Sequence, residues 1–100
     1  MHAEEILQKI TKPFIVAGIY KDEKTALIDI TLDYVRRRIA QYDHMIISLE
    51  KKHGCDFVQF TKKIKNNASL DTEDDWMEWK GAIEMRQYWK NANKMILNDE

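Results

Sequence analysis

The strongest constraint on the fold is a regular strip of apolar residues in the middle of the chain. Its members follow one another at steps of 4, 3, 4, 3, 4 and 3 residues: Ile28, Leu32, Val35, Ile39, Tyr42, Ile46 and Leu49. This heptad spacing is typical of a helix that packs along another helix. Asp22 is a good residue to begin the helix, His53-Gly54 is a good place to end it, and nothing between them breaks it. The strip predicts a helix over about 22–53, ~45 Å long, with a long helical neighbour.

The first half of this predicted helix is apolar on a second side as well. The additional apolar residues are Ala26, Leu27, Ile30 and Tyr34. Two apolar sides indicate burial between two neighbours. From Arg36 onward the strip is narrower, and one neighbour is sufficient there.

Residues 4–20 predict short N-terminal helices. Three apolar residues have helical rather than alternating spacing: Ile6, Leu7 and Ile10. Thr11 can cap a second short turn that tolerates Pro13 near its start. Gly18 can end that turn in the left-handed conformation, and Ile19 stands where a Schellman motif places its apolar contact.

Two more helices are expected in the second half. Residues 56–66 predict a short amphipathic helix capped by Asp56, and residues 72–97 predict a long C-terminal helix. Gly and Pro number only 3 and 1 in 100 residues, which disfavours a turn-rich β domain. We therefore predict a single all-α domain over 1–100, a helical bundle or hairpin that is dimeric through the heptad strip. The C-terminal helix could instead cover the strip within one chain.

Composition favours a cytoplasmic protein that does not enter a membrane. Cys55 is the only cysteine, so no internal disulfide can form, as expected in a reducing compartment. The longest apolar stretch, 14–20, is far short of the ~20 residues of a membrane span. The first residues lack the basic-then-apolar layout of a signal peptide.

The sequence offers no convincing catalytic or metal site. Residues 71–78 hold five acids, which favour the first turns of a helix but lack the spacing of a calcium loop. His53-Gly54-Cys55 supplies two ligands where a metal site needs three or four. We expect no enzyme activity, no metal and no cofactor.

Basic residues provide candidate nucleic-acid contacts, namely Arg36, Arg37, Arg38, Lys62 and Lys63. Three consecutive residues fan over ~200° of a helix, so the arginines do not form one patch. A net charge of −1 and a pI of about 6.3 also argue against a general nucleic-acid binder. DNA binding is therefore left open.

Aromatic residues are the most informative candidates for a functional surface. Three tryptophans fall within 14 positions, and Trp and Tyr dominate the energetics of protein interfaces. A small helical domain has little interior in which to bury them. The candidate partner-binding residues are Trp76, Trp79, Ile83, Tyr88 and Trp89.

Three segments resemble small prokaryotic antitoxins. Residues 13–23 resemble an opening "P-x-x-x-x-G-L/I-Y/F-x-S/D-E", residues 49–64 are similar to "LEKKYGMSFEEFxxKI", and residues 73–82 resemble a tail "EDDWxEWxAA". They follow one another in the same order along the chain, between residues 13 and 82. The resemblance implies the antitoxin of a type II toxin–antitoxin pair. Such a protein neutralises by occlusion a toxin encoded nearby, often dimerises and sometimes represses its own operon.

The resemblance places toxin contacts on the tail motif, at Trp76, Trp79 and the helix that follows.

Apolar and polar residues do not alternate over residues 4–10, as they would in the strand of a ribbon-helix-helix DNA-binding protein. Two alternatives to the antitoxin remain. One is a helical oligomerising scaffold, and the other is a small DNA-binding transcriptional regulator.

Overall fold

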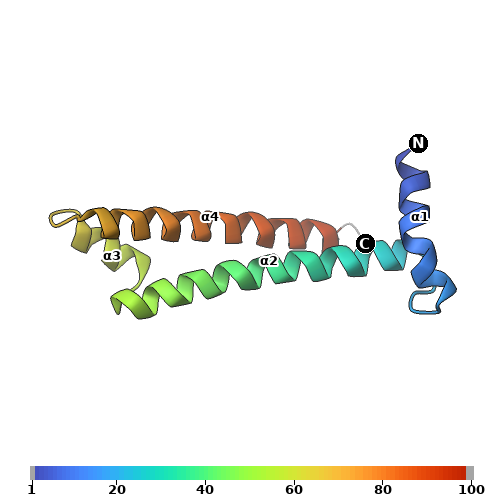
Figure 1. Cartoon of the computed structure of the whole chain (residues 1–100), viewed down its shortest axis with the longest axis horizontal. Coiled ribbons are helices and arrows are strands. Elements are labelled where there is room, and N and C mark those ends of the chain that lie inside the picture. The colour runs from blue at the N-terminus through green and yellow to red at the C-terminus, as the bar shows by residue number, and fades with distance from the viewer. Residues whose placement is uncertain (1, 99–100) are drawn as a thin grey trace.

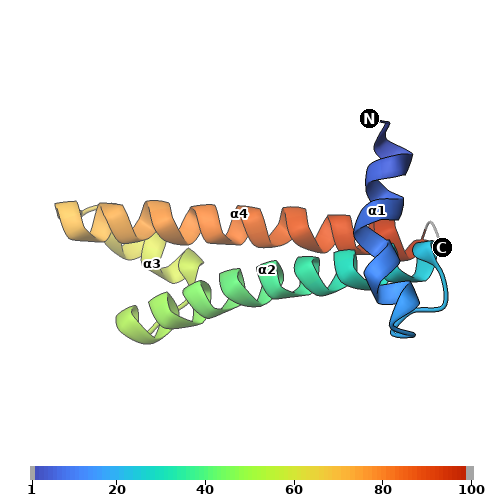
Figure 2. The same cartoon turned by 45° about the vertical axis from the view of Figure 1, so that its right-hand side comes forward.

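The computed structural model describes residues 2–98 and is all-α, as predicted. Its helices are α1 (Ala3–Val16), α2 (Glu23–His53), α3 (Phe57–Ile64) and α4 (Leu70–Asn98). The two long helices, α2 and α4, run side by side and antiparallel (Figures 1 and 2). α3 lies at one end of this hairpin, and α1 stands across the other end. No helix within residues 2–98 combines the length and apolarity needed to cross a membrane.

Both ends of α2 form as the sequence predicts. The Asp22 side chain accepts a hydrogen bond from the Thr25 backbone N–H at 2.8 Å, which satisfies one of the free donors of the first turn. Hydrogen bonding to Thr25, first by its side chain and then by its backbone N–H, lowers the pKa of Asp22. At the other end Gly54 has φ 66°, and its N–H donates to the Glu50 carbonyl at 2.8 Å. A left-handed residue favours glycine, so the chain turns sharply after His53.

The heptad strip of α2 is covered within the chain. Four of its residues are buried, Leu32, Val35, Ile46 and Leu49, and the other three are half-buried. α4 is the helix packed along α2. The hairpin alternative is therefore the arrangement that the structure has. A homodimer stays a prediction, and its contact must be sought outside this strip.

α3 closes the core at one end of the hairpin. Asp56 caps it by accepting from the Gln59 N–H at 2.8 Å, and Gln59 Oε1 accepts in return from the Asp56 N–H at 3.3 Å. This reciprocal capping box fixes where α3 begins. Phe60 then turns inward and is 3% exposed. The core cluster at this end comprises Ile46, Leu49, Phe60, Trp79 and Ala82.

The structure corrects the prediction of short N-terminal helices over residues 4–20. α1 is one helix that continues through Pro13. Thr11 does not cap a new turn, because its hydroxyl donates back to the Leu7 carbonyl at 2.9 Å and is buried. The predicted end is confirmed. Gly18 has φ 77°, its N–H donates to Ile15, and the Ile19 N–H donates to Phe14, which is the Schellman pattern.

The second apolar side of α2 is covered only in part, which also corrects the sequence prediction. Ala26 is fully buried, but Ile30 and Tyr34 are 40% and 49% exposed. α1 contacts the first part of α2 and then projects away from it (Figures 1 and 2). Because α1 leaves α2 so early, no second neighbour extends along that side.

Candidate partner-binding surfaces

The candidate aromatic residues do not share one environment. Trp79 is 0% exposed and is the largest fully buried side chain. Its ring lies 5.3 Å from that of Phe60, 5.6 Å from Phe57 and 6.0 Å from His53, measured between centroids. Trp79 therefore belongs to the core. A partner could reach Trp79 only if the helices separated. We therefore remove Trp79 from the candidate partner-binding residues.

Trp76 is half-buried and fixed in orientation. Its indole N–H donates to Thr61 Oγ1 at 2.9 Å, which ties α4 to α3. One side of the indole stacks on Phe57, with centroids 5.8 Å apart, and the Lys80 ammonium lies 5.4 Å from the Trp76 ring centroid. A tryptophan held this firmly loses little freedom when a partner binds, as a good interface anchor requires.

A pocket opens beside Trp76, between α3 and α4. Its volume is about 630 Å³, and it is lined mainly by apolar groups: Thr61, Ile64, Lys65, Ala68, Glu73, Trp76 and Met77. Lys65 and Glu73 supply one charge of each sign. A space of this size and polarity accepts an apolar side chain of a partner while charged groups bind at its rim. We call it the Trp76 pocket.

The remaining candidates lie further along α4. Trp89 is half-buried, with its ring 5.7 Å from that of Tyr34 and 5.5 Å from the Arg38 guanidinium. Ile83 is half-buried against the core cluster, whereas Tyr88 is 66% exposed. Of the candidates, Tyr88 is therefore the most exposed, and Trp76 is the one that lines the Trp76 pocket.

The basic residues are not brought together. Arg38 donates to Gln41 and to the Tyr42 hydroxyl at 2.9 and 2.8 Å, and Arg37 pairs with Asp33 at 3.1 Å. Arg36, Lys62 and Lys63 are exposed. The arginines lie in the middle of α2, whereas the lysines lie on α3, beyond the end of α2. The described residues thus form no continuous basic face from these side chains.

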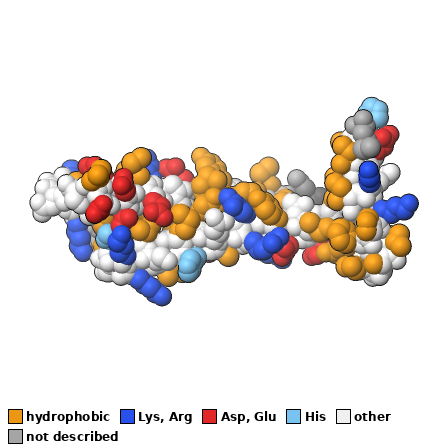
Figure 3. Space-filling view, viewed as in Figure 1, with side chains coloured by type: hydrophobic (Ala, Val, Ile, Leu, Met, Phe, Trp, Pro, Cys, Tyr) orange, Lys and Arg blue, Asp and Glu red, His pale blue; other side chains and the backbone are white. Residues whose placement is uncertain are grey.

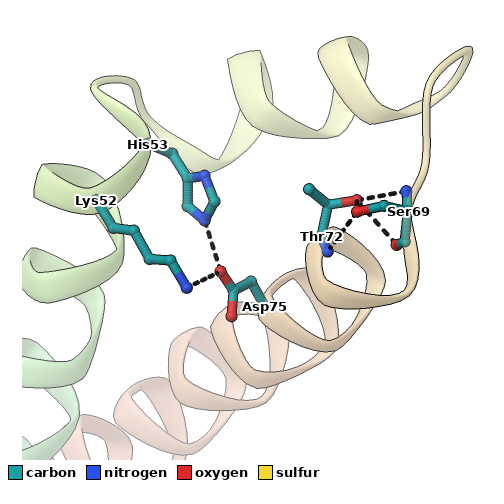
Figure 4. A network of polar contacts seen from close by, with 5 residues as sticks. All are labelled: Lys52, His53, Ser69, Thr72 and Asp75. Carbon is teal, nitrogen blue, oxygen red and sulfur yellow. Dashed lines mark hydrogen bonds and ion pairs between the residues drawn. The ribbon is translucent and has the colours of Figure 1, made fainter.

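One member of the acidic run, Asp75, joins the first turns of α4 to the last turn of α2. Asp75 Oδ2 lies 2.8 Å from both Lys52 Nζ and His53 Nε2 (Figure 4). The hydrogen bond from Lys52, followed by that from His53, lowers the pKa of Asp75, and burial opposes this shift only in part. Nearby, Ser69 and Thr72 exchange backbone–side chain hydrogen bonds that cap α4. Asp75 therefore fastens α4 to the end of α2.

Within residues 2–98 no three His, Cys, Asp or Glu side chains are grouped as metal ligands. Cys55 is half-buried and unbridged. No family model, curated protein or solved structure matches the chain. The exposed surfaces of the hairpin are therefore its candidate functional sites.

Two exposed apolar surfaces were not predicted from the sequence. One is the apolar face of α1, where Ile6, Leu7 and Ile10 are 41%, 37% and 55% exposed. The other runs along α4 on the side away from α2, and we call it the outer stripe. It comprises Leu70, Met77, Gly81, Tyr88 and Met95. Apolar side chains also gather over α4 and around α1 in the space-filling view (Figure 3). The spacing of the exposed methionines could have revealed the outer stripe.

Proposed function

We propose that the chain is a protein-binding module that holds a partner protein at the Trp76 pocket and blocks it by occlusion. The observation that carries this proposal is an apolar pocket beside a tryptophan held by both α3 and α4. An apolar pocket with a fixed tryptophan in its wall gives a partner's apolar residue a ready place to bind. No step of the proposal requires a bond to be made or broken.

The partner that fits this proposal best is the toxin of a toxin–antitoxin pair, encoded beside this chain. The resemblance of residues 73–82 to an antitoxin tail supports it, because Trp76 and Met77 of that segment line the pocket. The segment that resembles an antitoxin tail therefore lines a surface that a second chain can occupy. Trp79, from the same segment, would act through the core that positions Trp76.

Co-expression with the product of the neighbouring reading frame tests the proposal. The wild-type chain should co-purify with that product and restore growth when the product is toxic. Ala68→Glu, which puts a charge into the pocket from an exposed loop residue, should weaken binding by about 10-fold or more. Ile47→Glu is the matched control, because Ile47 is 48% exposed on α2 and lines none of the pockets described.

The outcome that overturns the proposal is equally specific. Either the neighbouring product does not bind the wild-type chain, or Ala68→Glu and Ile47→Glu bind it as well as the wild type does. Circular dichroism of each variant shows whether the helices are retained. A loss of binding with intact helices in Ala68→Glu alone places the contact at the pocket.

A helical scaffold is the second candidate function. The observation that favours it is the outer stripe, which leaves large apolar side chains exposed along α4. A scaffold would form stable oligomers without any toxic neighbour. Growth assays of the neighbouring frame therefore separate the two functions.

A further inference from the structure

The outer stripe has the geometry of a helix–helix contact. Its residues follow at steps of 7, 4, 7 and 7, which keep to one side of a helix. Leu70, Met77, Tyr88 and Met95 are 75%, 67%, 66% and 66% exposed. The buried residues of α4, Trp79 and Ala82, face α2 from the other side. The stripe is thus a second apolar line on α4 that residues 2–98 leave largely uncovered.

Gly81 lies in the middle of this stripe, and the isolated chain does not require a glycine there. A Cβ built at Gly81 would meet no atom within 4 Å, and the residue is helical. A glycine in a helix interior costs about 1 kcal/mol relative to alanine. Its absent side chain leaves room for a neighbour to approach α4 at this point.

Charge along α4 is strongly divided. Residues 70–84 contain six acids and one base, whereas residues 85–98 contain three bases and no acid. Asp75 and Arg86 are paired with α2 residues, but Glu73, Asp74, Lys90 and Lys94 are exposed. A helix with one acidic half and one basic half is complementary to its own antiparallel copy. Parallel pairing would instead place acid beside acid.

We propose that the outer stripe binds the outer stripe of a second copy, with the two α4 helices antiparallel. Placing Gly81 opposite Tyr88 of the second copy also places Met77 opposite Ala92. Each pair sets a large side chain against a small one, which suits close packing. In the same register Lys94 lies opposite Asp75, one residue from Asp74, so the basic half of one α4 runs along the acidic half of the other.

The position of α1 also supports a second copy of the chain as the partner of the outer stripe. In both views α1 projects past α4 on the side away from α2, beside the end of α4 (Figures 1 and 2). An antiparallel second copy would bring the start of its own α4 to this place. The exposed face of α1, including Ile6 and Ile10, would then meet Leu70 of the second copy. The interface would be isologous, so each contact occurs twice.

Sedimentation equilibrium over a range of concentrations tests this dimer. The wild-type chain should approach twice 11.9 kDa. Tyr88→Glu should raise the dimer dissociation constant by about 100-fold or more, because the charge enters the interface twice. Gly81→Leu should also weaken the dimer while leaving the monomer's helices intact. Val58→Glu, at a 63% exposed residue of α3, is the control and should dimerise normally.

Cysteine crosslinking tests the direction of the helices. In a Cys55→Ser background, a Met77→Cys chain mixed with an Ala92→Cys chain should form a mixed disulfide in preference to either homodimer. A monomeric wild type, a dimer insensitive to both Tyr88→Glu and Gly81→Leu, or preferred 77–77 crosslinks would overturn the proposal. Toxin binding by a monomeric Tyr88→Glu chain would leave the Trp76 pocket proposal standing, so the two proposals can fail separately.

Discussion

At the scale of single residues, burial separates side chains that the sequence shows as equivalent. Trp76 and Trp79 are three positions apart in one motif, yet one lines a pocket and the other is fully buried. Helical periodicity predicts that both lie on one broad side of α4. It cannot predict which of them α3 covers, because that depends on where Phe57 and Phe60 arrive after the turn at Gly54. The candidate surface could therefore be predicted only in outline.

Trp79→Ala should destabilise the fold severely. Removing a fully buried indole leaves a cavity among Phe57, Phe60 and His53, at a cost of about 3–5 kcal/mol. Ile47→Ala, at an exposed position, should change the free energy of unfolding by about 0.5 kcal/mol or less. Urea unfolding of both variants measures the difference. Equal costs would contradict the placement of Trp79 in the core.

Asp75 should make stability depend on acid pH. Its pKa is lowered in the folded chain by the hydrogen bonds from Lys52 and His53, so the unfolded chain binds the proton more tightly. The stabilisation is therefore present above the ordinary value of 3.8 and is lost as pH falls through the lowered value. Thermal unfolding of wild type and Asp75→Asn should show a gap near pH 5 that narrows below pH 3.8. A constant gap would show that the pairs contribute nothing.

At the scale of elements, local sequence rules work well at the ends of helices and less well inside them. The caps of α2 and α3 and the glycine that ends α1 were predictable, because capping depends on one to four neighbouring residues. Thr11 and Pro13 suggested a break that does not occur. The Thr11 hydroxyl already donates to the Leu7 carbonyl in the preceding turn, so it does not cap a new helix.

Pro13→Ala should make α1 more stable. Proline lacks the N–H that would bond to the Lys9 carbonyl, and its ring crowds that carbonyl. Replacing it should stabilise α1 by about 1–3 kcal/mol, partly offset by the greater freedom of the unfolded chain. Amide hydrogen exchange should slow in α1 and stay unchanged in α3. Faster exchange in α1 would show that proline holds the helix rather than straining it.

At the scale of the whole molecule, the hairpin is a rod. Its radius of gyration is 19.6 Å and its extents are 60 × 26 × 23 Å, whereas a compact chain of this length has a radius of ~13 Å. The heptad strip predicted a long helix with a long neighbour, and that neighbour is α4. The spacing alone could not show whether the neighbour came from the same chain, because both choices bury the same seven residues.

The rod is unevenly fastened along its length. The densest cluster of rings, formed by His53, Phe57, Phe60, Trp76 and Trp79, lies at the α3 end together with the Asp75 pairs. Towards the α1 end the buried residues of α2 are the smaller Ala26, Leu32 and Val35, and the one ring pair that joins α2 to α4 there among residues 2–98 is Tyr34 with Trp89. Local opening follows the least buried surface. Thermal fluctuations should thus spread the helices first at the α1 end, with the shape around Trp76 preserved. The α1 end can therefore change shape to fit a binding partner while the α3 end stays rigid.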